Sequence, residues 1–504
     1  MSVHEVELKL QVPGEARAAL EAALDVAHWQ RTALEAHYFD TAGGQLAAHG
    51  FSWRLRKENG RWKQTLKGDG GHLLQRLEDE LEVEAEAGRA VPRPDVTRHR
   101  DSPAGRALAA ALGGSLDDLS TLVVEQFHTR IERRTRLMNH GDAQVEVAFD
   151  AGSVHAKGQT APVCELELEL KAGAPEGLFA LARPWVAAHG LWLSTISKSQ
   201  RGALLAAGHT HGPVVKAGVP ALDWSMSPPA LLRAIVASCL AQILPNASEI
   251  AAGSVDADHV HQARVGLRRL RTALRELGEL APVLDPERQE VLATAFSRLG
   301  EVRDQEAVSR TVLSRLAEAG APEELQWPRP EGEVHQPGPA VRDAAFQAVL
   351  LELLEFSLSE PPPQPGCKRD GACRKGLRRR LARLHKQVVH DGERFTELSV
   401  EHQHRVRKRL KRLRYLSEFL SSLYGTHAVE RYVEALRPAQ DALGLHNDDA
   451  VGLEAFNRAK DTQPQAWFAV GWLSAQQRET ARECRRALRK VADAPRFWKK
   501  KGKH

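Results

Sequence analysis

The chain has 504 residues, which is too long for one ordinary hydrophobic core and suggests two or three domains. Hydrophobic residues make up 42% of it and charged residues 27%, as in soluble globular proteins, and no run of 18 apolar residues predicts a transmembrane helix. The net charge of +5 is unevenly divided, because residues 1–205 contain 24 Lys and Arg against 28 Asp and Glu, whereas the remainder contains 46 against 37. The second part is therefore the better candidate for holding an anion.

The cysteines and the N-terminal sequence favour a cytoplasmic protein. The opening MSVHEVELKLQV lacks the basic start and apolar stretch of a secretory signal. Five cysteines in a chain of this length do not make a disulfide framework, and the odd number suggests reduced thiols. Cys367 and Cys373 lie in a loop rich in Pro and Gly, and we expect a structural or incidental role for them.

The first 205 residues have the pattern of β-strands, because polar and apolar residues alternate with a period of two. The alternation is found in seven segments: 6–12, 51–57, 61–68, 78–86, 124–137, 143–152 and 163–171. Helical patterns lie near 15–27, 103–112 and 175–189. Many antiparallel strands with few helices suggest a barrel or a curled sheet.

A stretch rich in Gly, Pro and Ala at 206–224 is the predicted linker, and the apolar period changes to 3.6 after it. We predict an all-α helical-bundle domain over 225–495 and a basic tail at 496–504. Helices are expected near 230–243, 257–279, 286–319, 341–357, 372–390, 400–424, 427–444, 448–460 and 465–491.

The helical region contains a weak internal repeat with a basic stripe in each copy. HQARVGLRRLR begins at His261, and HRVRKRLKRLR begins at His404. Residues three, four and seven apart share a helix face. The stripes are His261, Arg264, Arg268, Arg271 and Arg275 in the first copy, and His404, Arg407, Lys411 and Arg414 in the second, with Lys408 at its margin. A charged stripe can be a solvated surface, but two matched stripes with almost no aromatic residues favour binding of a phosphate chain rather than of bases.

Charged side chains also share faces on the predicted strands. Glu5, Glu7 and Lys9 alternate with apolar residues, as do Glu165, Glu167, Glu169 and Lys171. An ordinary sheet with a solvated, ion-paired outer face is one interpretation. Because seven strands follow this pattern, we favour a closed barrel that directs its charges inward.

The two kinds of charge indicate the ligand. Arg and Lys suit phosphate oxygens, whereas a carboxylate cluster would repel an anion unless a hard cation such as Mg²⁺ or Mn²⁺ lay between them. Such an interior is typical of a metal–polyphosphate site, where water attacks a phosphorus in line.

Six sequence blocks in order resemble the CYTH domain of the triphosphate tunnel metalloenzymes. They are HEVELK at the start, YFDT at 38–41, WRLRK at 53–57, QTLKG at 64–68, CELELELK at 164–171 and SKSQRG at 197–202. The resemblance covers residues 1–205. It implies an eight-stranded antiparallel tunnel barrel with flanking helices, and hydrolysis of a triphosphate with Mg²⁺ or Mn²⁺.

The resemblance also implies roles for individual residues. The carboxylates on the metal side would be Glu5, Glu7, Glu165, Glu167, Glu169 and Asp150. The phosphate-gripping, catalytic residues would be Lys9, Arg54, Arg56, Lys67, Arg134 and Lys198. Lys63, Arg201 and Glu146 would help to bind the substrate. The choice of Arg134 rests on parity in a strand that also carries Arg130, Arg133 and Arg136.

The helical region resembles the CHAD domain over about 225–495, on the basis of HQARVGLRRLR, LGEVRD, HRVRKRLKRLRY and AQDALGLHND. This resemblance implies binding of inorganic polyphosphate by histidines and basic residues. On the matching positions these are His261, Arg264, Arg268, Arg271, His404, Arg407, Lys408, Lys411 and Arg414.

The sequence therefore predicts an α+β protein that hydrolyses inorganic triphosphate to pyrophosphate and phosphate and that binds polyphosphate through its helical domain. Alternatives in the same tunnel are nucleoside triphosphatase, thiamine triphosphatase and adenylate cyclase activity, and a non-enzymatic polyphosphate-binding granule protein is a further alternative. We expect cytoplasmic localisation with possible association with polyphosphate granules, no membrane partner and no nucleic-acid partner.

Overall fold

The computed structural model describes residues 4–86, 88–281, 284–328, 336–360, 366–367 and 371–499. The chain forms two compact units. The barrel unit comprises residues 1–216, 240–263 and 337–359, and the helical unit comprises 217–239, 264–336 and 360–504.

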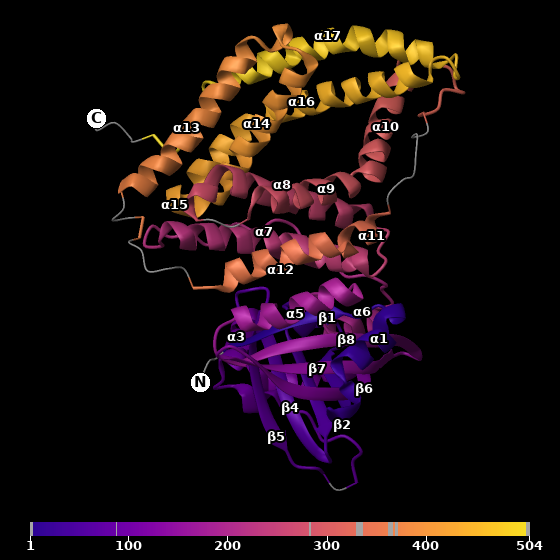
Figure 1. Cartoon of the computed structure of the whole chain (residues 1–504), viewed down its shortest axis with the longest axis vertical. Helices are drawn as coiled ribbons and strands as arrows, with labels where there is room; N and C mark the ends of the chain where they lie inside the picture. The colour runs from indigo at the N-terminus through magenta and orange to yellow at the C-terminus, as the bar shows by residue number, and fades with distance from the viewer. Residues whose placement is uncertain are drawn as a thin grey trace. The chain divides into compact units, whose positions relative to one another are not determined.

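Eight antiparallel strands close into a barrel (Figure 1). Their order around the ring is β5-β4-β3-β2-β6-β7-β8-β1, and pairing of β1 with β5 closes it. The strands are β1 (His4–Gln11), β2 (Gln30–Thr41), β3 (Ser52–Glu58), β4 (Arg61–Asp69), β5 (Gln75–Val83), β6 (Val123–His140), β7 (Ala143–Ala156) and β8 (Gln159–Ala172). A two-residue strand, β9 (Trp192–Leu193), pairs with β1. The predicted eight-stranded antiparallel barrel is therefore confirmed.

Apolar side chains of the strands face outward and pack under the flanking helices. Trp53, Leu55 and Leu66 are at most 1% exposed and form one cluster with Leu108 of α3 and Leu119 of α4. The flanking helices are α1 (Arg17–Leu24), α2 (Gln45–Ala48), α3 (Pro103–Leu112), α4 (Leu116–Leu122), α5 (Glu176–His189) and α6 (Lys198–Ala207). This apolar cluster thus lies outside the ring, whereas most side chains that β1, β3, β4, β5 and β8 direct into the interior are charged.

Part of the ring is packed against α6. Leu34, Phe127 and Ile131 form an apolar cluster with Ala206 of this helix. A Cβ atom on Gly202 would lie 2.1 Å from the Phe127 ring, so only glycine permits this close approach of α6 to β6.

The C-terminal region is helical, as predicted. Its helices are α7 (Pro228–Ala251), α8 (Ala257–Leu277), α9 (Pro286–Arg298), α10 (Glu301–Glu318), α11 (Pro337–Arg342), α12 (Ala344–Leu358), α13 (Gly371–Glu393), α14 (Val400–Phe419), α15 (Ser421–Tyr424), α16 (Thr426–Ala459) and α17 (Ala466–Val491). The single helix predicted over 286–319 is two helices, because the first one ends at Arg298. The two helices predicted over 427–460 are one continuous helix that contains Pro438.

Helix α7 is long and apolar enough, by length and composition, to cross a membrane. However, 61% of its apolar window is buried inside the structure, as in a core helix of a soluble protein. The helix also carries the buried side chain of Asn246, whose amide donates a hydrogen bond to the backbone oxygen of Val215 at 2.8 Å. We find no clear membrane-protein signal in the described part of the chain.

The expectation of reduced thiols is wrong for one pair of cysteines. Cys367 and Cys373 form a disulfide, with their Cα atoms 5.5 Å apart. The two cysteines are six positions apart in the sequence. Cys164, Cys239 and Cys484 are free.

Candidate active site

The interior of the barrel contains a cavity of about 1140 Å³. Side chains from all eight strands of the ring line it, and most of those from β1, β3, β4, β5 and β8 are charged. Because neighbouring residues on a strand point to opposite sides, the charged faces point into the tunnel while the apolar faces support the outer helices.

Three carboxylates from β7 and β8 converge in the wall of this cavity. Asp150 lies directly opposite Glu165 in the β7–β8 ladder, and Glu167 follows on the same face. One oxygen atom of each lies within 4.8 Å of the others. Asp150 and Glu165 are 0% and 1% exposed. Such a buried acidic cluster is costly unless cations accompany it.

Two cations of the chain accompany these carboxylates. Lys198 Nζ lies 2.6 Å from Asp150 and 2.8 Å from Glu167, and it also contacts Glu165. Arg133 Nη2 lies 2.6 Å from Asp150 and 2.5 Å from Glu167. Burial by itself raises the pKa of each of these two carboxyls, but Lys198 and Arg133 outweigh burial and hold both pKa values below their usual range.

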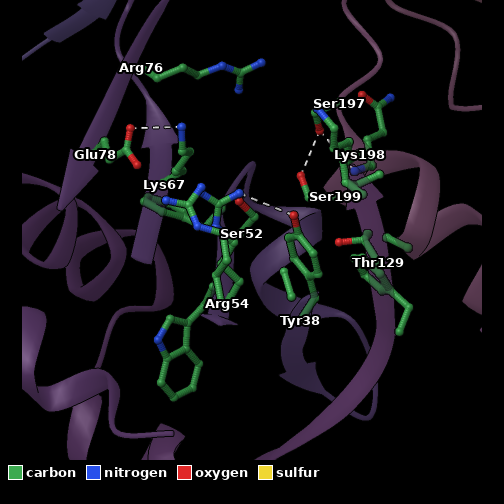
Figure 2. Close-up of a pocket in the computed structure, with 18 of the residues that line it drawn as sticks. Tyr38, Ser52, Arg54, Lys67, Arg76, Glu78, Thr129, Ser197, Lys198 and Ser199 are labelled. Carbon is green, nitrogen blue, oxygen red and sulfur yellow. Dashed lines mark hydrogen bonds and ion pairs between the residues drawn. The ribbon is translucent and has the colours of Figure 1, made fainter. Parts of the chain in front are cut away.

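Helix α6 positions Lys198, which is its first residue. Ser197 caps the helix, since its Oγ accepts a hydrogen bond from the backbone N–H of Gln200 at 3.0 Å. Figure 2 shows Ser197, Lys198 and Ser199 together beside the pocket. The N-terminus of a helix carries partial positive charge, so α6 adds to the attraction for an anion.

On β1, Glu5 belongs to a second charged group. Lys67 Nζ lies 2.9 Å from Glu5 and 2.9 Å from Glu78, and Figure 2 shows the pair with Glu78. Burial, opposed by Lys67 and assisted by the hydrogen bond with Glu78, raises the pKa of Glu5 to about 9. Burial acts in the same direction on Glu78, but Lys67, the Glu5 hydrogen bond and Arg54 hold its pKa at about 2. The two carboxyls therefore share one proton at neutral pH.

Next to Glu5, Glu7 faces the acidic cluster. It lies opposite Glu169 in the β1–β8 ladder. Burial and the charge of Glu167 raise the pKa of Glu7. Burial, with repulsion from Glu167 added to it, therefore lets Glu7 retain a proton more readily than an exposed glutamate.

A basic wall lies on β3 and β4. Its members are Arg54, Arg56, Lys63 and Lys67. Glu80 lies 3.2 Å from Arg56 and 2.9 Å from Lys63, so it orients both cations. Arg54 Nη1 donates to the Tyr38 hydroxyl at 3.5 Å (Figure 2). These side chains supply several N–H donors that suit phosphate oxygens.

Three more of the predicted residues, Lys9, Glu146 and Glu169, line the cavity, as does Lys171. Lys9 Nζ lies 3.7 Å from Glu167. Lys171 Nζ lies 2.5 Å from Glu169 and 3.5 Å from Glu146. Together with the residues described above, this places every predicted metal carboxylate in or next to the tunnel wall, although only three of them lie within 4.8 Å of one another.

Three predicted residues do not line the cavity: Glu165, which lies just behind its wall, Arg134 and Arg201. Arg134 pairs with Glu132 at 2.7 Å on the other face of β6. Arg201 donates to the backbone oxygen of Pro162 at 2.7 Å and to Gln11 Oε1 at 3.1 Å, which ties α6 to β8 and β1. In place of Arg134, its neighbour Arg133 projects into the tunnel, and the sequence prediction had missed it.

The chemistry of the acidic cluster fits a divalent metal ion. Asp150, Glu165 and Glu167 provide carboxylate oxygens, which are the ligands that Mg²⁺ and Mn²⁺ prefer. Their separation allows one small ion to contact all three. These residues therefore have the strongest claim to a metal in the described part of the chain.

The basic stripe of α8 is supported by an aromatic ring. The guanidinium carbons of Arg264, Arg268 and Arg271 lie 4.7, 5.6 and 5.8 Å from the centre of the Phe296 ring on α9. The three arginines therefore share one face of α8, as their spacing predicted. The sequence pattern did not indicate Phe296, whose ring restricts the three arginine side chains by cation–π contact.

The stripe on α14 includes His404, whose Nδ1 lies 3.2 Å from Asn447 Oδ1. Burial, then the charges of Lys408, Arg407 and Lys411, lower the pKa of His404. The guanidinium carbon of Arg414 lies 4.7 Å from the centre of the Tyr415 ring. The stripe on α14 is thus a region of positive potential.

Comparison with known families divides the chain in the same order as the sequence blocks. The CYTH domain model matches residues 3–203, and the CHAD domain model matches residues 234–457. A curated relative, the inorganic triphosphatase of Haemophilus influenzae, is 27% identical over 209 residues, which are 40% of this chain and 55% of the relative. The chain therefore matches about half the length of that relative.

Solved structures resemble each part separately. The CHAD domain from the plant Ricinus communis is 28% identical, with 55% of this chain and 96% of that one covered and a TM-score of 0.43. A putative adenylyl cyclase from Hippeastrum, described as having a dominant triphosphatase activity, is 22% identical, with 41% and 96% covered and a TM-score of 0.31.

Proposed function

We propose, from the premise that this chain is a CYTH domain followed by a CHAD domain, that its tunnel hydrolyses inorganic triphosphate to pyrophosphate and phosphate. The observation that carries the proposal is the Asp150–Glu165–Glu167 cluster and the basic wall within one barrel, where Asp150, Glu167 and the basic wall line the same cavity. The 27% identity to an inorganic triphosphatase supports an activity of the triphosphatase type.

Basic residues would bind the phosphate groups, and carboxylates would bind the metal ion. Arg54, Arg56 and Lys67 hold the phosphate oxygens and neutralise the charge that develops on them. Glu80 keeps Arg56 extended into the tunnel. Asp150, Glu165 and Glu167 would hold Mg²⁺ or Mn²⁺, which when bound lowers the pKa of water and withdraws charge from phosphoryl oxygens.

Phosphate release from a panel of substrates tests this proposal. We expect release from tripolyphosphate with Mg²⁺ or Mn²⁺, and little from ATP, thiamine triphosphate or long-chain polyphosphate. Release from none of the four would contradict the enzymatic proposal and favour a non-enzymatic polyphosphate-binding protein. Faster turnover of ATP or thiamine triphosphate would assign the tunnel to one of the alternative activities.

For the helical region we propose binding of long-chain polyphosphate to the stripes on α8 and α14, in the cytoplasm and at polyphosphate granules. The contacts of Arg264, Arg268 and Arg271 with Phe296 support this, because they hold three guanidinium groups on one face before any ligand arrives. Replacing Arg268 and Arg271 with Ala should weaken binding of polyphosphate and reduce its salt dependence. Unchanged binding would leave the stripes as solvated surface.

A further inference from the structure

The helical unit contains a second cavity, of about 800 Å³, between α13 and the segment 492–499 that follows α17. Both segments belong to the same compact unit. Six basic side chains line this cavity, and Glu393 is its one acidic residue among those described. The basic residues are Lys375, Arg378, Arg379, Lys386, Arg496 and Lys499. None of them belongs to the basic stripes on α8 and α14.

The two sides of α13 use their arginines differently. Arg383 lies 3.0 Å from Glu276 on α8, and Arg380 contacts Glu279, so this side is neutralised by structural ion pairs. By contrast, none of the six cavity cations forms an ion pair with a carboxylate among the described residues. Among the described residues, six cations thus line the cavity against the single carboxylate of Glu393, which forms no ion pair with them, so positive charge is in excess there.

The floor of the cavity is built from packed aromatic residues. His385 is 5% exposed, and its Nδ1 lies 2.9 Å from the Tyr432 hydroxyl. The Trp498 ring lies edge-on to both, with centroid distances of 5.8 Å to His385 and 4.9 Å to Tyr432. These contacts fix the C-terminal segment against α13 and thereby hold Arg496 and Lys499 over the cavity.

The pKa of His385 reflects burial and the positive charge around the cavity. Burial, followed by the positive charges of Arg496 and Lys499, lowers the pKa of His385 to about 4. The imidazole of His385 is therefore neutral at physiological pH and adds no positive charge to the cavity.

The shape and charge define the class of ligand. Six cations against one carboxylate exceed the charge of about −2 on one phosphate group, so an anion with several phosphates matches the cavity better. Trp498 is 4% exposed, and its ring is occupied by His385 and Tyr432, so it offers no free face for stacking a base. We propose that this cavity is a second anion site, separate from the stripes, that binds a compact anion with two or more phosphate groups.

Local hydrogen exchange on the full chain tests this site with inorganic pyrophosphate and tripolyphosphate in EDTA. Both probes should slow amide exchange in peptides covering 375–393 and 492–499. The variant Arg379→Ala/Lys386→Ala should require roughly tenfold more probe for the same protection, because two charged donors are lost. The matched control, Arg482→Ala/Arg486→Ala, removes two exposed arginines of α17 that pair with Glu479 outside the cavity, and should behave as the unmodified chain does.

Two results would overturn the proposal. The first is no protection of these peptides by either probe, and the second is equal protection in the cavity variant and the control. A third sample with long-chain polyphosphate explains the first result, because protection by the long chain alone would make the cavity part of a polyphosphate-binding surface. Because the readout is local exchange and not turnover, it is independent of the activity proposed for the tunnel.

Discussion

Each charge at the acidic end of the tunnel has a partner within the chain. Lys198 contacts three carboxylates, and Arg133 contacts two of the same three. Buried charges persist only when they are paired in this way, because the low dielectric makes an unpaired charge very costly. Under the proposed function, binding of a metal and a triphosphate requires these residues to exchange one set of charged partners for another.

Arg133 and Arg134 form a natural pair for testing which face of β6 is functional. We expect Arg133→Ala to lower kcat/KM for tripolyphosphate about 100-fold, because the variant loses a half-buried cation beside Asp150 and Glu167. Arg134→Ala removes an outward-facing ion pair with Glu132 and should change kcat/KM less than about twofold. Steady-state phosphate release measures both. A larger loss in Arg134→Ala would mean that β6 is shifted by one residue.

Glu167→Gln tests the metal site with little change in side-chain volume. One ligand oxygen becomes an amide, so we expect turnover at a fixed Mn²⁺ concentration to fall at least about tenfold and the metal affinity to fall similarly. Glu132→Gln on the outward face of the barrel serves as the control and should retain both. Calorimetric titration of Mn²⁺ and phosphate release are the measurements, and unchanged affinity in Glu167→Gln would move the metal elsewhere.

The proton on Glu5 predicts a pH dependence of stability. Between its usual pKa of 4.5 and about 9, folded Glu5 keeps a proton that the unfolded chain releases, so this contribution is full below pH 4.5 and is lost as pH rises toward 9. We expect Glu5→Gln, measured in EDTA, to reduce the fall in melting temperature between pH 6 and pH 9 by at least about 2 °C. Glu132→Gln should not reduce this fall in melting temperature, since the hydrogen bond with Arg134 lowers the pKa of Glu132. An identical fall in Glu5→Gln and the unmodified chain would contradict the shared proton.

The alternation of charged and apolar residues along the strands predicted most of the site residues. On β6 it predicted Arg134 instead of Arg133, and this error has a physical reason. The prediction assumed that the charged side of every strand faces the tunnel. On β6 the inward side also carries Phe127 and Ile131, because α6 packs there with its own apolar residues. The outward side carries Arg130 and Arg134 instead. A strand with charges on both faces has no unique parity, so only tertiary packing decides between Arg133 and Arg134.

At the level of elements, α6 both packs against the barrel and presents Lys198. Its N-cap can be tested by comparing Ser197→Ala with Ser115→Ala, which removes the N-cap of α4. Each should cost about 1 kcal/mol of stability. Only Ser197→Ala should lower kcat, by several-fold, because fraying of the first turn of α6 displaces Lys198 from the carboxylates. Equal kcat values in the two variants would show that the cap does not position the lysine.

The elements missed in the sequence are those whose pattern mixes two environments. Strand β2 (Gln30–Thr41) was not predicted, since its inward residues Leu34, Ala36 and Tyr38 are apolar or amphipathic and do not alternate with apolar outward residues. The break between α9 and α10 was not predicted either, because the apolar period continues across it. Period-2 and period-3.6 patterns thus identify elements with one polar and one apolar face.

At the level of the whole molecule, the two compact units do not coincide with the strand-rich and helix-rich regions of the sequence. Residues 240–263 and 337–359 belong to the barrel unit, although they lie among the helices of the C-terminal region. The backbone N–H of Leu193 donates to Gln347 Oε1 at 2.8 Å, and that of Thr195 donates to Ser248 Oγ at 3.0 Å. A sequence pattern shows where the apolar period changes from two to 3.6, but not which distant helix accepts a hydrogen bond from a buried N–H group. The domain boundaries predicted from the sequence, at residues 205 and 225, therefore stay a prediction.

Gln347 tests whether these helices stabilise the barrel unit. It is 2% exposed, and its Nε2 also donates to the backbone oxygen of Val341 at 2.6 Å. Gln347→Ala leaves the N–H of Leu193 buried without a partner, and we expect a loss of about 1–3 kcal/mol. Gln289→Ala removes an exposed amide that bonds only the oxygen of Leu284 at 3.3 Å, and it should change stability by less than about 0.5 kcal/mol. Unfolding in denaturant, monitored by hydrogen exchange of the barrel amides, measures the stability of both variants. If Gln347→Ala unfolds the barrel no more readily than Gln289→Ala does, then α12 does not support β9, and the barrel would fold independently of the helices.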